Sequence, residues 1–74
     1  MASYRMIEVV GVSNKNYEDA IKIAIEDAKS CLENDNQALD GEGWYQVLDQ
    51  RGRLVDGKIM EFQIKLNVSF NIKK

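Results

Sequence analysis

The stretch that decides the fold is DGKIMEFQIKLNVSFNI, residues 56–72. Asp56 and Gly57 form a dipeptide that is typical of a two-residue hairpin turn. After the turn, apolar residues alternate with polar ones, and a period of two is typical of a strand with one buried face. The apolar set comprises Met60, Phe62, Ile64, Leu66, Val68, Phe70 and Ile72. We therefore expect a strand over residues 58–72 that packs this face on a helix.

Three further elements are expected before this strand. Residues 44–51 form the other arm of the hairpin, and the β-branched, apolar residues 4–10 favour a first strand. Residues 17–33 have a helical period, and Asn16 followed by Asp19 resembles a capping box at the helix start. The apolar stripe of this helix comprises Tyr17, Ala20, Ile21, Ala24, Ile25, Ala28, Cys31 and Leu32. The predicted order is β-α-β-β, with the last two strands antiparallel.

Residues 33–43, ENDNQALDGEG, carry turn formers and little periodicity. We expect a loop here, or a frayed helix end followed by a loop. Gly41 and Gly43 would leave such a loop free to fold over the residue that follows, Trp44.

Composition indicates one globular domain, residues 1–74, with 45% hydrophobic and 30% charged residues. So small a domain is marginally stable alone, and one cysteine with no histidine excludes an intrachain disulfide and a zinc finger. Self-association is the remaining source of stability. The net charge of −2 offers no basic surface for nucleic acid, and no apolar run is long enough for a membrane span. Without a signal sequence in residues 1–5, and with one unpaired cysteine, we expect a cytoplasmic protein.

The only tryptophan, Trp44, begins the second predicted strand. A tight turn at residues 56–57 would set the register so that Gln50 opposes Gln63 and Trp44 opposes Ser69. Directly opposed residues share a face of the sheet. The indole is therefore expected on the polar face, turned away from the helix.

Tyr45 and Val47 are expected on the other face, in the core. Two interpretations of Trp44 follow. It fills an interface between subunits, or it is a stacking plate for a planar ligand. Trp44 and Gln63 would lie about 20 Å apart along the ladder, at ~3.3 Å per residue. A single ring that contacts both therefore requires two subunits.

Other chemistry has little support in the sequence. There is no histidine, no nucleophile elbow and no Gly-rich phosphate loop, so we expect no enzyme. Cys31 lies on the apolar helix stripe and is predicted to be a buried core thiol. Four acidic residues could suit calcium, but their spacing fails the EF-hand pattern, so a solvated acidic loop is expected. They are Glu33, Asp35, Asp40 and Glu42.

In order, these segments resemble the dodecins, a family of small flavin-binding cage proteins. YRMIEVVGVS resembles the first strand and turn of the family, and NYEDAIKIAIEDA resembles its helix. WYQVLDQRG and DGKIMEFQIKLNVSF resemble its hairpin, so the resemblance covers nearly the whole chain. It implies an α+β, β-α-β-β subunit whose three-stranded antiparallel sheet wraps around one amphipathic helix. It also implies a homododecameric cage of cubic symmetry.

The function implied is flavin storage and photoprotection, with FMN or riboflavin stacked in pairs between tryptophans at two-fold axes. The matching positions are Trp44 for stacking, Gln63 for the polar edge of the ring, and Arg51 near the ligand's tail or phosphate. A tryptophan against a flavin can quench its excited state by electron transfer. Relative to the family, this chain carries several extra residues within 33–43, between the helix and the tryptophan. The alternative is a structural or cation-binding cage of the same fold, whose flavin site is disabled by this insertion.

Two departures from the family pattern and one conflict between that pattern and the predicted register affect the expected ligand site. Asn71 stands where some relatives carry an arginine that holds a phosphate, which favours an uncharged flavin over FMN. Asp27 and Glu33 stand where some relatives bind coenzyme A through basic residues, which disfavours that ligand. A tight hairpin also sends Arg51 to the face opposite the indole. Either a bulge near Gly52 corrects this, or Arg51 serves a site in another subunit.

Overall fold

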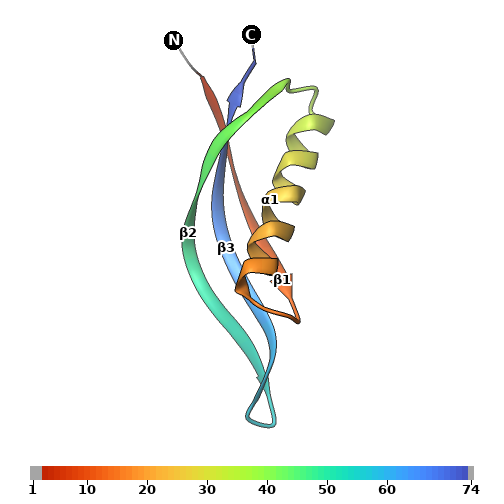
Figure 1. Cartoon of the computed structure of the whole chain (residues 1–74), viewed down its shortest axis with the longest axis vertical. Helices are drawn as coiled ribbons and strands as arrows, with labels where there is room; N and C mark the ends of the chain where they lie inside the picture. Colours follow the sequence, from red (N-terminus) through yellow and green to blue (C-terminus); the bar gives the residue numbers. More distant parts are fainter. Residues whose placement is uncertain (1–2, 74) are drawn as a thin grey trace.

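The computed structural model describes residues 3–73. The elements are β1 (Tyr4–Ser13), α1 (Tyr17–Asn34), β2 (Leu39–Val55) and β3 (Lys58–Ile72). The strands form one antiparallel sheet in the order β1-β3-β2, and α1 lies along one face of it (Figure 1). The predicted α+β fold with β-α-β-β order is therefore confirmed, and the final strand of the chain is the central strand of the sheet.

The start of α1 follows the capping chemistry expected from the sequence. The Asn16 side chain accepts a hydrogen bond of 2.7 Å from the backbone N–H of Asp19, which satisfies a donor that the first turn leaves free. The Asp19 carboxylate accepts a 2.6 Å hydrogen bond from the Ser13 hydroxyl. The helix start is thereby tied to the end of β1.

Three small residues and then a leucine face the sheet at every fourth position of α1, namely Ala20, Ala24, Ala28 and Leu32. Their size lets the helix approach β1 so closely that a Cβ added at Gly11 would lie 1.9 Å from the Ala20 carbonyl oxygen. Cys31 is exposed, and the prediction of a buried thiol is wrong. Each residue turns about 100° around a helix, so Cys31 points well away from the neighbouring buried Leu32.

The core forms where α1 covers β1 and β3. Four alternate residues of β3, Ile64, Leu66, Val68 and Phe70, are buried against Val9 and the small residues of the helix. The hairpin extends past the start of α1, so the apolar residues at its tip are left uncovered (Figure 1). These exposed residues are Leu54, Val55, Ile59 and Met60. The predicted packing of β3 on the helix thus holds for its middle and fails at Met60.

Strand β2 is not covered by the helix. Tyr45 and Val47, which were expected in the core, are 49% and 43% exposed, so that prediction is wrong. A helix is about 10 Å wide and strands are ~4.8 Å apart, so one helix covers about two strands. Here α1 packs on β1 and β3. The third strand keeps both of its faces accessible.

The register of the β2–β3 hairpin agrees with the prediction next to the turn and at Trp44, and differs in the segment between these two places. Trp44 opposes Ser69 as expected. Between Trp44 and the turn, two of the three irregularities of this ladder occur, one between Val47 and Asp49 and the other between Arg53 and Leu54. The first leaves an extra residue in β2 and the second leaves one in β3, so the two shifts cancel.

Between the two bulges, every pairing is displaced by one residue. Arg51 opposes Gln63, and Gln50 opposes Ile64, so the predicted pairing of Gln50 with Gln63 is wrong. Because directly opposed residues share a face, Arg51 lies on the same face as Gln63. A bulge in β2 is therefore the correct alternative for the orientation of Arg51, but it lies between Val47 and Asp49 and not near Gly52.

Residues 33–43 are not a free loop. The helix runs to Asn34, and from Leu39 onward the chain belongs to β2, where Leu39 pairs with Ile72. The backbone N–H of Lys73 donates to the Ala38 carbonyl at 2.7 Å, which extends this edge. A Cβ at Gly43 would lie 1.9 Å from the Ser69 carbonyl oxygen, so glycine there permits close strand approach. The prediction of a loop free to fold over Trp44 is wrong, since the segment is held in the sheet.

Candidate functional site

An aromatic pair occupies the face of the sheet that α1 leaves open. Trp44 on β2 is 51% exposed, and its ring lies against that of Tyr4 on β1. The ring centroids are 4.7 Å apart and the planes are inclined by 55°. Between these strands, Ser69 of β3 is buried, and its Oγ has no hydrogen-bonding partner. The exposed surface of the indole is therefore available to a planar ligand.

A polar cluster lies farther along the same face. The Arg51 Nε–H donates a 2.9 Å hydrogen bond to the Gln63 Oε1, and the Gln63 Nε2 donates one of 3.2 Å to the Glu61 Oε1. Arg51, Gln63 and Lys65 line a hollow of about 190 Å³ together with Val10 and Asp49. The displaced register between the bulges is what brings Arg51 beside Gln63.

The hydrogen bonds of Gln63 leave it with unused capacity. A primary amide has two acceptor positions on its oxygen and two N–H donors. Arg51 takes one acceptor position and Glu61 takes one donor. One donor and one acceptor position therefore remain, and such a pair suits a heterocycle edge that alternates C=O and N–H. The bond from Arg51 also fixes which end of the amide is the acceptor.

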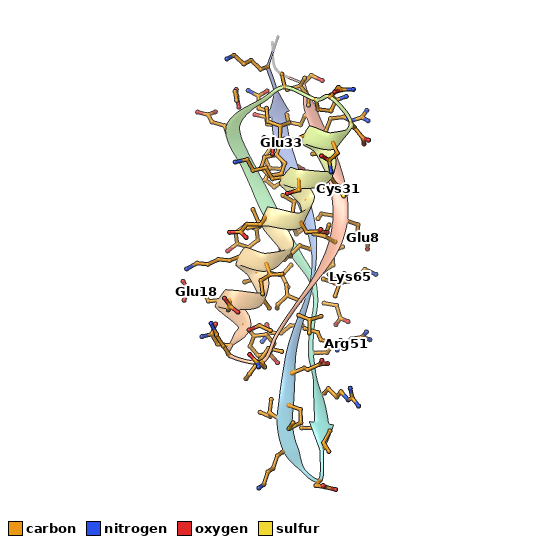
Figure 2. All side chains as sticks on the ribbon, turned by 90° about the vertical axis from the view of Figure 1, so that its right-hand side faces the viewer. Glu8, Glu18, Cys31, Glu33, Arg51 and Lys65 are labelled. Carbon is orange, nitrogen blue, oxygen red and sulfur yellow. The ribbon has the colours of Figure 1, made fainter. Side chains whose placement is uncertain are left out.

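Charged residues around this cluster are mixed in sign. The Lys65 Nζ forms an ion pair of 3.0 Å with the Glu8 carboxylate, and both side chains are about half exposed. Figure 2 shows Glu8, Lys65 and Arg51 following one another along one side of the molecule. Lys65 is thus partly neutralised, and the Arg51 guanidinium keeps donors beyond its single bond to Gln63.

The aromatic pair and the polar cluster cannot hold the same ring within one chain. Trp44 opposes Ser69, which is six residues from Gln63 along β3. At ~3.3 Å per residue the two positions are about 20 Å apart. One ring could contact both groups only if two copies of the chain came together.

The Asp40 carboxylate, which was expected in a solvated acidic loop, is bonded to a residue beside the aromatic pair. Asp40 Oδ2 accepts a hydrogen bond from the Asn71 Nδ2, and its Oδ1 accepts one of 2.9 Å from the backbone N–H of Glu42. Asn71 opposes Tyr4 in the sheet. The negative charge of Asp40 therefore lies beside Asn71, the position where an arginine was expected in some relatives.

The structure adds no support for a coenzyme A site or a metal site among the described residues. Asp27 and Glu33 are exposed carboxylates on α1. Within residues 3–73, no group of three His, Cys, Asp or Glu side chains is placed to hold a metal ion. In the same part of the chain, no helix has the length and apolar character needed to cross a membrane.

Comparisons with known proteins agree with this fold. The Dodecin family model matches residues 3–73. The chain is 31% identical over 71 residues to a dodecin of Thermus thermophilus, covering 96% of this chain and 93% of that protein. Its structure is similar to the dodecin of Streptomyces davaonensis, with a TM-score of 0.77, 32% identity and coverage of 99% and 97%. The Streptomyces coelicolor dodecin is also similar, with a TM-score of 0.75, 30% identity and coverage of 99% and 94%. The chain belongs to the dodecin family.

Proposed function

We propose that this protein binds and stores flavins in a homododecameric cage and shields them from light, without catalysing a reaction. The observation that carries the proposal is the pair of half-sites on one sheet face. Trp44 offers an exposed aromatic surface, and Gln63 offers a free donor and acceptor about 20 Å away along the sheet. Assembly would bring Trp44 of one subunit against Gln63 of another. The single cysteine suits a reducing compartment, so we expect this store in the cytoplasm.

Exposed apolar surface supports assembly. Within residues 3–73, large apolar side chains are exposed along β2 and at the hairpin tip. They include Tyr45, Val47, Leu48, Leu54, Ile59 and Met60. Contiguous exposed apolar surface of this kind marks an interaction site, and burying it against other copies of the chain would supply the stability that so small a core lacks.

Each site residue has a distinct role in this proposal. Trp44 stacks on the isoalloxazine ring and quenches its excited state by electron transfer. The Gln63 amide pairs with the polar edge of the ring, and Arg51 holds that amide in the required orientation while its free donors face the ligand's tail. Asp40 places a negative charge beside Asn71, which favours riboflavin over the phosphate-bearing FMN.

Two measurements test the proposal. Sedimentation of the purified protein should give the mass of a dodecamer of 8.5 kDa chains. Adding the protein to riboflavin should quench the vitamin's fluorescence with saturation. A stable monomer at micromolar concentration would contradict the cage. An assembled protein that leaves riboflavin fluorescence unchanged would favour the alternative, a structural or cation-binding cage.

A further inference from the structure

The contact between Tyr4 and Trp44 joins the two outer strands of the sheet across β3. Tyr4 begins β1, and Trp44 lies on β2. Their centroid distance of 4.7 Å and inclination of 55° lie in the range of favourable aromatic pairs. The backbone hydrogen bonds of the sheet do not require a contact between side chains of its two outer strands. The contact therefore affects the position of the indole and not the pairing of the strands.

The central strand is covered beneath the aromatic pair. Ser69 of β3, which opposes Trp44 of β2 and Met6 of β1, is 1% exposed. The space between the aromatic pair and the central strand is therefore closed to a ligand. Trp44 nevertheless keeps half of its surface exposed, and a ligand would have to contact that surface.

We propose that Tyr4 is a positioning residue for ligand stacking, which holds the indole of Trp44 at one tilt with its outer face presented. This inference rests on the proposed flavin function. An unsupported indole on an edge strand samples several rotamers, and a ligand must then immobilise it on binding. Tyr4 supplies that order beforehand. Tyr4 is itself 43% exposed, so its burial adds little to the core, and a purely structural role explains the contact less well.

The test compares Tyr4→Leu with the matched control Tyr4→Phe, which keeps the ring, in protein whose assembly has been checked by sedimentation. Trp44 is the only tryptophan, so its fluorescence anisotropy and near-ultraviolet circular dichroism report on this indole without any ligand. Riboflavin affinity is then measured by fluorescence titration.

We expect Tyr4→Leu to lower the indole anisotropy and to weaken riboflavin binding about threefold to tenfold, the cost of ordering one freed side chain. Bound riboflavin should stay largely dark, because Trp44 is still present. Tyr4→Phe should retain wild-type behaviour, because the ring makes the contact. Tyr4→Met repeats the test if Tyr4→Leu does not fold.

Unchanged anisotropy and unchanged riboflavin affinity in Tyr4→Leu would overturn the positioning role. So would a loss in Tyr4→Phe equal to that in Tyr4→Leu, since the ring would then not be the cause. A wild-type protein that binds no riboflavin, combined with lower anisotropy in Tyr4→Leu, would reject the flavin function while supporting the control of the indole by Tyr4.

Discussion

Replacing Trp44 by alanine tests the centre of the proposed site. A buried tryptophan covers about 150–250 Å², and half of Trp44 is still exposed, so about 100 Å² is available. A flat ligand covers about half of that, which at ~25 cal/mol per Å² contributes about 1.2 kcal/mol. Aromatic stacking adds about 0.5–1.5 kcal/mol. The sum of about 2 kcal/mol predicts that Trp44→Ala weakens riboflavin binding about thirtyfold.

The assay is a fluorescence titration of riboflavin with wild-type and Trp44→Ala protein, at concentrations that span both affinities. Wild-type protein should darken the flavin. Trp44→Ala should bind it weakly and leave the bound fraction fluorescent, because the electron donor is gone. Equal affinity and equal quenching in the two proteins would refute the reasoning and make Trp44 an interface residue. Trp44→Phe is the matched control, since it keeps an aromatic plate and should lose less affinity.

Three further variants separate the other contributions. Gln63→Ala should weaken riboflavin binding about tenfold by removing the partner of the ring edge, yet leave bound flavin dark; a fluorescent complex would contradict this. Asp40→Asn should raise FMN affinity about twofold to threefold relative to riboflavin at low salt, and a gain that persists in high salt would not be electrostatic. Ser69→Ala should raise the melting temperature, because it removes a buried hydroxyl without a partner; a lower melting temperature would show that the hydroxyl is bonded in the assembly.

The parts of the fold with a regular period could be predicted from the sequence. Strand β3 has the predicted bounds, because its alternation is uninterrupted from Met60 onward and its turn is a strong signal. The start of α1 follows from its capping residues. The exposure of Tyr45 was missed because it depends on strand order. Once β1 is known to pair with β3, the width of one helix excludes β2 from the core.

The site was predicted in part for similar reasons. Trp44 lies on the expected face because the turn and the ladder up to Ser69 determine it. Tyr4 was missed because no short turn joins β1 to β3, so their register is not readable from sequence. The bonded position of Asp40 was missed because residues 39–43 were expected to be a loop, whereas Leu39 and Gly43 pair with β3.

The two bulges are what reconcile the stacking residue with the polar cluster. Both occur where two apolar residues are adjacent in the sequence, Val47-Leu48 and Ile59-Met60, which breaks the alternation on each strand. A one-residue shift in register moves each side chain of a strand to the other face of the sheet. Either bulge alone would therefore change the face of every residue beyond it in that strand. Together they displace only the segment around Arg51. That segment alone changes face, so Arg51 reaches Gln63 while Trp44 keeps the position set by the turn.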